Sequence, residues 1–323
     1  MRNHILKLGL VLVASTAAFA QAPPPHQFHI TRTIELGGDG SWDYLRYDPD
    51  GRRLFISRST HVMVADLAAG KVIGDIPGTE GVHGVALVPA LQRGVTSNGK
   101  ANNAFIFDQN SLKVLATVDT GAKPDGILYE PLTKTVLTMN AAENSISVID
   151  VAAAKVIATI ALPGRPETAI SDERGNIFVN LEDKSQIAVI SLATRKVAQT
   201  WNLADCTEPT GLAIDAAHAR LFTACHNGVL IAVDVSSGKN IQKLPIGLGV
   251  DAVAYDPELK TVFTTNKDGT LSVIRQLDAD HYENQETVQT LPGAKTIALD
   301  DERHLVYTVA NQNGNFVLLE IGR

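Results

Sequence analysis

Short apolar runs alternate with turn-forming residues along most of the chain. The stretch from Gly121 to Pro163 shows this most clearly, because it holds four such runs separated by polar and turn residues. Runs of four to seven residues bounded by turn residues predict β-strands. Residues 151–162 (VAAAKVIATIAL) have helical propensity, but the equivalent residues 235–244 (VSSGKNIQKL) do not. We therefore predict strands at both places.

The pattern repeats with a period of about forty residues. An apolar pair followed by a third, mostly polar residue marks the third run of each repeat, and successive markers lie 42, 42, 41, 43 and 41 residues apart. A period of this length with four strands in each unit predicts a β-propeller. The markers are Val64-Ala65-Asp66, Ile106-Phe107-Asp108, Val148-Ile149-Asp150, Val189-Ile190-Ser191, Ala232-Val233-Asp234 and Val273-Ile274-Arg275.

The repeat predicts an all-β fold, a seven-bladed β-propeller with four antiparallel strands in each blade. The last unit has only three predicted strands, whereas residues 28–36 alternate like a strand before the first full unit. We expect residues 28–36 to supply the outer strand of the last blade, which leaves no exposed sheet edge. Residues 28–323 then form a single domain. The predicted units are 37–77, 78–120, 121–163, 164–205, 206–246, 247–290 and 291–323.

The first twenty residues have the features of a secretory signal peptide. Arg2 and Lys7 give a positive start, residues 8–13 are apolar, and Ala18-Phe19-Ala20 forms a small-x-small cleavage site. The apolar core is too short to span a hydrocarbon layer of about 30 Å. We expect a periplasmic or secreted protein, cleaved near Ala20, with no membrane span after signal removal. Residues 21–27, rich in proline, are predicted to be a flexible leader.

Charge and motifs exclude several classes of function. The formal net charge is −7 at pH 7 and no cluster of Lys and Arg is present, so no nucleic-acid partner is expected. G-x-S-x-G, H-E-x-x-H and phosphate-binding Gly motifs are absent, as is the C-x-x-C-H of haem attachment. The two cysteines, Cys206 and Cys225, suggest a disulfide in an oxidising compartment, with two free thiols as the alternative.

The loops that enter the first strand of each blade carry most of the candidate chemistry. First strands line the channel of a propeller, so these seven loops should deliver side chains to one channel mouth. Four of the side chains are carboxylates, and one imidazole, one hydroxyl and one ammonium complete the ring. Its members are Asp43, His83, Asp125, Glu167, Thr210, Asp251 and Lys295.

Three interpretations of this ring stay open. It can be a solvated polar funnel, a mouth that binds a small polar molecule, or a site for a divalent cation held by oxygen ligands. Carboxylates this close together repel, so raised pKa values are expected unless a cation or Lys295 compensates. His83 is the only imidazole in the ring, and we therefore expect it to carry any proton transfer or metal ligation.

A second ring comes from the ends of the second strands. Arg58 can pair with Asp43 or receive an anionic group of a ligand. The asparagines at the equivalent positions, Asn140 among them, can bind a ligand or bond locally within their turns. The members are Arg58, Asn98, Asn140, Asn180 and Asn266.

Residues 135–167 (TVLTMNAAENSISVIDVAAAKVIATIALPGRPE) resemble the YVTN repeat of the YncE-like seven-bladed β-propellers of bacteria. TVLTMN stands where the family has its Tyr-Val-Thr-Asn core, and GRPE matches the Gly-x-x-Pro between blades. The first unit departs from the pattern with Arg58 in place of Asn, and the fourth departs with Asn180-Leu181. The resemblance implies the propeller fold and export, and it brings no catalytic residues.

These observations favour an exported monomer that acts as a binding or scaffolding module, with a small polar ligand or a protein partner at the channel mouth. The alternative is a metal-dependent, lactonase-like hydrolase that uses a divalent cation at the acidic mouth. A quinoprotein-like redox partner is less favoured, because no motif for cofactor attachment is present.

Overall fold

The structure, a computed structural model, describes residues 27–38 and 40–323. The expected signal peptide and cleavage point, and the leader up to residue 26, lie outside the described residues. Within them the chain forms β-strands and two single-turn 3-10 segments, η1 (Pro89–Leu91) and η2 (Glu182–Lys184). None of the helical segments described has the length and apolar character needed to cross a membrane.

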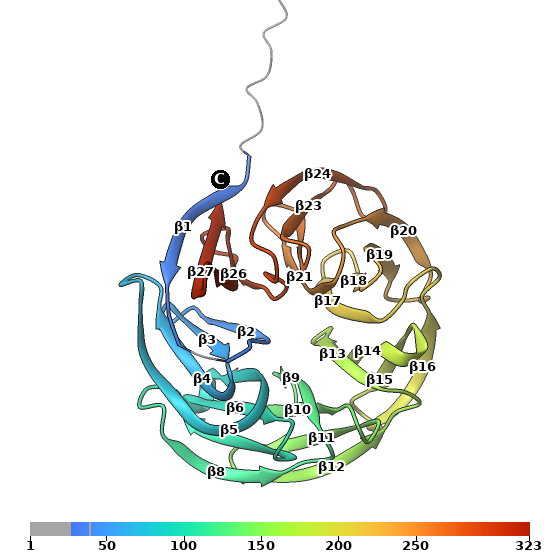
Figure 1. Cartoon of the computed structure of the whole chain (residues 1–323). Helices are drawn as coiled ribbons and strands as arrows, with labels where there is room; N and C mark the ends of the chain where they lie inside the picture. Colours follow the sequence, from blue (N-terminus) through green and yellow to red (C-terminus); the bar gives the residue numbers. More distant parts are fainter. Residues whose placement is uncertain (1–26, 39) are drawn as a thin grey trace, which may run out of the picture.

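Five four-stranded sheets and one seven-stranded sheet form the described part of the chain, and all strand pairs are antiparallel. Figure 1 shows the sheets arranged around a common centre, with β2, β9, β13, β17 and β21 innermost. This is an all-β arrangement of the β-propeller type.

The seven-stranded sheet comprises β2 (Leu45–Asp48), β3 (Arg53–Ser57), β4 (Ser59–Asp66), β5 (Lys71–Val88), β6 (Arg93–Asn98), β7 (Asn103–Asp108) and β8 (Val114–Asp119). The next two sheets comprise β9 (Pro124–Glu130), β10 (Thr135–Asn140), β11 (Ser145–Asp150) and β12 (Lys155–Ala161), and then β13 (Pro166–Ser171), β14 (Asn176–Leu181), β15 (Gln186–Ser191) and β16 (Lys196–Asn202). The segment with helical propensity is therefore a strand, β12.

The following two sheets comprise β17 (Pro209–Asp215), β18 (Arg220–Cys225), β19 (Val229–Asp234) and β20 (Asn240–Pro245), and then β21 (Val250–Asp256), β22 (Thr261–Asn266), β23 (Thr270–Gln276) and β24 (Tyr282–Gln289). The last sheet has the order β1-β27-β26-β25, with β1 (His29–Glu35), β25 (Ala298–Asp300), β26 (Leu305–Gln312) and β27 (Asn315–Gly322).

The 18-residue strand β5 is the middle strand of the seven-stranded sheet and connects its first half, β2 to β4, with its second half, β6 to β8. Its first part, from Lys71 to Pro77, pairs with β4, whereas its second part, from Val82 to Val88, pairs with β6. The strand therefore runs from the outside of one half of the sheet to the inside of the next, and it covers the place where the sequence repeat predicts a boundary at Pro77.

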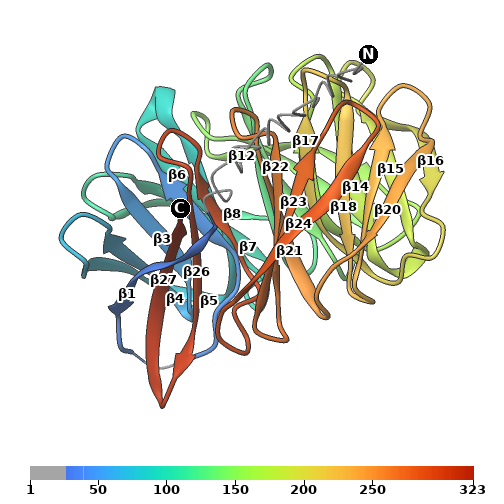
Figure 2. The ribbon, with the colours of Figure 1, turned by 90° about the horizontal axis from the view of Figure 1, so that it is seen from above.

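The two ends of the described chain lie in one sheet. Strand β1 pairs antiparallel with β27, as predicted for residues 28–36, and Figures 1 and 2 both show the two strands side by side. Ile34 of β1 is buried in a cluster that includes Leu54 and Leu318. Phe28, just before β1, packs edge-on against Phe263 with ring centroids 5.1 Å apart. The start of the chain therefore covers apolar surface as well as a sheet edge.

The core lies between neighbouring sheets. Leu137 and Ile146, for example, share one buried cluster with Ile177 and Ile190 of the next sheet. Alternate side chains of a strand point to opposite faces, so each sheet contributes to the cluster on either side. This packing leaves the ends of the strands free to carry polar loops, and the candidate site lies at one such end.

Removing β1 should destabilise the fold. Deletion of residues 21–36 exposes the β27 edge and the apolar cluster under Ile34, so we expect a lower melting temperature and aggregation on size-exclusion chromatography. Deletion of residues 21–26 alone leaves β1 in place and serves as the control. A 21–36 deletion variant that stays monomeric with an unchanged melting temperature would contradict this prediction.

Candidate functional site

Residues of the predicted ring lie at equivalent irregularities near the start of the innermost strands. His83 has no partner in its ladder, because β5 pairs with β6 through Val82 and then through Gly84. An inserted residue of this kind is a β-bulge, and bulges change the direction of a side chain and often lie beside binding sites. The same irregularity contains Asp125 in β9, Glu167 in β13, Thr210 in β17 and Asp251 in β21.

Close contact between neighbouring innermost strands holds these bulges together. A Cβ atom on Gly126, the residue after Asp125, would overlap the carbonyl oxygen of Glu167 in the next sheet. Only glycine allows β9 and β13 to approach this closely. Hydroxyl groups add hydrogen bonds across the same gaps: Ser97 Oγ donates to the carbonyl of Asp125 at 2.5 Å, and Thr265 Oγ1 donates to that of Lys295 at 2.9 Å.

Asp43, His83 and Asp125 form one cluster. His83 Nδ1 lies 2.6 Å from Asp43 Oδ2 and 3.2 Å from Asp125 Oδ1. One potential ligand atom from each of the three residues lies within 4.8 Å of the other two. Side-chain exposure is 23% for Asp43, 24% for His83 and 10% for Asp125, so the cluster is largely shielded but reachable. The sequence placed these three residues in one ring of seven, and the structure shows that they are in contact with one another.

Burial and mutual charge shift the titration of this cluster. Burial lowers the pKa of His83, but the hydrogen bond to Asp43 and the charge of Asp125 outweigh it, so the pKa is raised overall. Burial raises the pKa of Asp125 to about 6, although His83 and Lys123 act against the shift. The imidazole therefore favours its charged form, while Asp125 pays a large desolvation penalty for its charge.

The remaining acidic members of the ring have other partners. Tyr44 donates its hydroxyl to Glu167 Oε1 at 2.7 Å, and burial together with the charge of Asp125 raises the pKa of Glu167 well above its usual value. Lys295 forms an ion pair with Asp251. Burial raises the pKa of Asp251 against the effect of that ammonium group. The raised carboxylate pKa values expected from crowding are thus present, and burial is their first cause.

Thr210 does not face the mouth in the way its place in the ring suggested. It is buried, and its hydroxyl donates to the carbonyl of Val250 at 2.8 Å. The residue therefore links two innermost strands and has no free polar group for a ligand. Tyr44, which follows Asp43 in the sequence, contacts the ring through the hydrogen bond from its hydroxyl to Glu167.

The side chain of Asn140, predicted as a possible ligand-binding group, is hydrogen-bonded within its own sheet. It is fully buried, and its amide nitrogen donates to Ser145 Oγ at 2.9 Å and to Ser147 Oγ at 3.0 Å. Asn266 makes the equivalent pair of bonds with Thr270 and Ser272. Asn140 and Asn266 thus bond locally, one of the two alternatives for these asparagines, whereas Asn180 bonds to the carbonyls of Thr210 and Gly211 in the next sheet.

Arg58 also differs from its predicted role. Its side chain is only 1% exposed, and its guanidinium lies 3.5 Å from the ring centroid of Phe316. It donates to the carbonyls of Gly37, Gly38 and Gly40 at 3.3, 3.0 and 3.0 Å. The guanidinium therefore holds the loop that leads to Asp43.

A cavity of about 550 Å³ opens beside the cluster. Trp42 and Val82 give it an apolar part, whereas Lys100 and Lys123 bring positive charge. The sequence did not single out these two lysines, because lysine in a turn is common on any protein surface. The lining residues are Ser41, Trp42, Asp43, Ser59, Gly81, Val82, His83, Gly99, Lys100 and Lys123.

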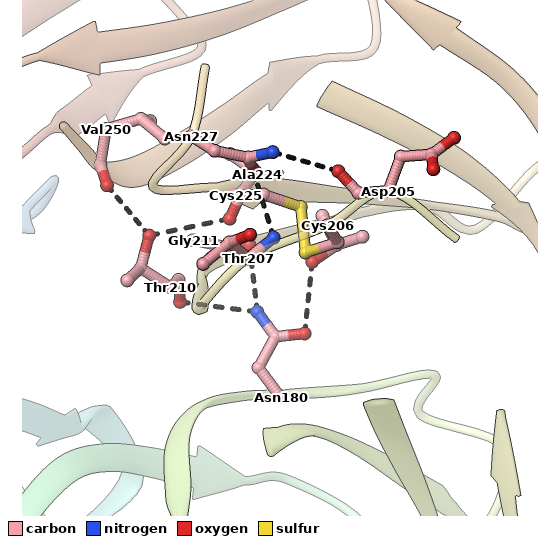
Figure 3. The surroundings of a disulfide bond; sticks show 11 residues. Asn180, Asp205, Cys206, Thr207, Thr210, Gly211, Ala224, Cys225, Asn227 and Val250 are labelled. Atoms are coloured by element: carbon pink, nitrogen blue, oxygen red, sulfur yellow. Dashed lines mark hydrogen bonds between the residues drawn. A yellow bond between two sulfur atoms is a disulfide. The ribbon is translucent and has the colours of Figure 1, made fainter. Parts of the chain in front are cut away.

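A disulfide joins Cys206 and Cys225, with their Cα atoms 5.4 Å apart (Figure 3). Pro209 lies opposite Cys225 in the ladder, and Thr210 lies in the bulge that follows. In Figure 3, Asn180 of the neighbouring sheet reaches the same segment, and its amide donates to the carbonyls of Thr210 and Gly211 at 3.3 and 3.0 Å. The disulfide thus fixes the segment that leads into β17.

Comparison with known proteins identifies the type of fold. No protein-family model matches the chain, and no curated protein matches it. Among solved structures it is similar to hydrazine synthase of Kuenenia stuttgartiensis, with a TM-score of 0.75 and 16% sequence identity over 85% of this chain and 94% of that one. A likeness at this identity concerns the fold alone, and it agrees with a β-propeller.

Replacing Arg58 should lower stability. Arg58→Ala leaves several carbonyl groups of the loop without their donor and removes the contact with Phe316. Each buried acceptor left unsatisfied costs about 1–3 kcal/mol, so we expect a loss of at least about 2 kcal/mol in the free energy of unfolding, measured with denaturant. Arg52→Ala, at an exposed turn, is the control. Equal stability of the two variants would show that Arg58 is not a structural residue.

Glu167 should make stability depend on pH. Its pKa is raised in the folded state, so its contribution to stability is fully present below the ordinary glutamate pKa of about 4.3 and is lost as pH rises through the folded value. Glu167→Gln stays neutral and keeps an acceptor for Tyr44. The variant should therefore gain stability relative to the wild type as pH rises.

The measurement is the free energy of unfolding of both proteins from acid to alkaline pH. Glu302→Gln, whose parent side chain is 75% exposed, is the control. Parallel curves for Glu167→Gln and the wild type would mean that Glu167 carries no such shift.

Proposed function

We propose that this chain is a binding protein that receives a small polar ligand at the mouth of a seven-bladed propeller. The cavity beside Asp43 and His83 carries the proposal, because it joins an apolar wall with a few convergent polar groups. Lys100 and Lys123 favour a ligand with an anionic group, which they would attract. Trp42 offers a flat surface for the rest of the molecule.

The seven-bladed form is part of this proposal. Divided between Pro77 and Val82, strand β5 contributes one strand to each half of its sheet, so the seven-stranded sheet becomes two blades of four strands. With the five four-stranded sheets this gives seven blades, and β1 joins the last blade to the start of the chain. The predicted repeat boundary within β5 and the YVTN-like sequence repeat both support this reading.

We also propose export to an oxidising compartment. The signal-like start of the chain supports it, and so does the disulfide, since such bonds persist outside the reducing cytosol. The YncE-like resemblance is in keeping with export. A monomer remains our expectation, and the net charge of −7 makes a nucleic-acid partner unexpected.

A metal-dependent hydrolase of the lactonase kind is the second candidate. One observation favours it: an imidazole between two carboxylates borders a cavity of ligand size. Such a group can transfer a proton or hold a cation next to a bound substrate. The redox-partner alternative gains no support from the described residues.

The binding function is tested by screening small polar molecules, first acids and then neutral compounds, for a thermal shift of the purified protein. For a compound that binds, we expect Lys123→Ala and His83→Ala to weaken affinity at least about tenfold, or about 1.4 kcal/mol. Calorimetry gives the affinities.

Lys134→Ala is the matched control, because Lys134 is exposed in the turn at the far end of β9. Its affinity should equal that of the wild type. If Lys134→Ala abolishes binding while Lys123→Ala and His83→Ala bind normally, the ligand site lies on the other face and the proposal is wrong.

A further inference from the structure

We propose that Asp43, His83 and Asp125 form a binding site for a transition-metal dication, Zn²⁺ in the first place, with an open coordination position toward the mouth cavity. Three separate segments supply the donors: the loop before β2, the bulge of β5 and the bulge of β9. Their potential ligand atoms converge within 4.8 Å of one another. The three side chains already lie close enough together to contact one ion.

The spacing suits a small ion with short bonds. Zn²⁺ is bound at about 2.0–2.2 Å by imidazole nitrogen and carboxylate oxygen, which places neighbouring ligand atoms of a tetrahedron about 3.3–3.5 Å apart. His83 Nδ1 and Asp125 Oδ1 are 3.2 Å apart. The 2.6 Å between His83 Nδ1 and Asp43 Oδ2 is a hydrogen bond, so the ion would replace that proton and widen the contact slightly.

The type of donor selects the class of metal. One imidazole with two carboxylates suits Zn²⁺ and its transition-metal neighbours. Ca²⁺ takes six to eight oxygen ligands, which these three residues do not supply. The sequence suggested a cation held by oxygen ligands and also named His83 as a metal ligand, and the imidazole in the cluster favours an ion that accepts nitrogen.

Two features distinguish this cluster from the other carboxylates of the ring. Asp251 is paired with Lys295 and Glu167 accepts from Tyr44, whereas Asp43 and Asp125 both lie within 3.2 Å of His83 Nδ1. Lys123 Nζ also lies 3.8 Å from Asp125 Oδ2. Asp43 and His83 line the cavity, which gives an ion a path to the site and leaves room for a fourth ligand. Asp125 is 10% exposed, and a cation in contact with its carboxylate would offset the cost of burying that charge.

A metal here would hold an oxygen atom of a molecule in the cavity, next to Lys100 and Lys123. The site thus bears on both candidate functions, but its test uses the metal alone. A protein that binds Zn²⁺ and no small molecule would refute the proposed function and support this inference. A protein that binds a small molecule and no Zn²⁺ would support the proposed function and refute this inference.

The test is calorimetric titration of the full chain, freed of metal with a chelator, with ZnCl₂ and, in parallel, with CaCl₂. We expect one Zn²⁺ per chain and no measurable binding of Ca²⁺ at the same concentrations. His83→Ala and Asp43→Asn should each lower the affinity for Zn²⁺ at least about tenfold. Thermal melting of each variant shows whether it is folded. One folded variant of the two is sufficient to test whether the cluster binds Zn²⁺.

Asp251→Asn is the matched control, since Asp251 lies in the equivalent bulge of β21 but is paired with Lys295. It should bind Zn²⁺ like the wild type. The inference is overturned if the wild type binds no Zn²⁺, if folded His83→Ala and Asp43→Asn bind it unchanged through histidines elsewhere on the surface, or if Asp251→Asn loses as much affinity as they do.

Discussion

The site depends on one backbone irregularity that is repeated around the centre of the fold. A bulge lies near the start of β9, β13, β17 and β21 and at His83 in the second half of β5, and each bulge turns one polar side chain out of the ladder. The close contact at Gly126 and the hydrogen bonds of Ser97 with Gly84 and Asp125 hold neighbouring bulges close to one another. Without this arrangement the same side chains would follow the regular alternation of a strand, and they would not converge.

Convergence has an electrostatic cost, and the ring meets it in three different ways. Lys295 neutralises Asp251, the Tyr44 hydroxyl bonds to Glu167, and His83 lies between Asp43 and Asp125. The last solution differs from the others because imidazole can exchange its proton for a metal ion. The cluster of these three residues adjoins the cavity, which Asp43 and His83 line.

Some polar residues that the sequence suggested for ligand binding instead make hydrogen bonds that stabilise the fold. Asn140 and Asn266 bond to hydroxyl groups on the adjacent strand, and Arg58 bonds to the loop that leads to Asp43. A buried polar group must be paired to be tolerated. Residues at strand ends that are shielded from water are for this reason more often structural than free.

The sequence by itself determined the strand pattern, the partner strand of β27 and the group of residues from which the site is drawn. These follow from local periodicity and from the number of predicted strands in each repeat, both of which can be read directly along the sequence. Only the tertiary structure decided that Asp43, His83 and Asp125 meet, that Thr210, Asn140 and Arg58 turn away, and that Lys100 and Lys123 border the cavity. A repeat specifies which positions are equivalent, whereas the bulges, the close approach at Gly126 and the pairing of buried charge decide where each side chain points.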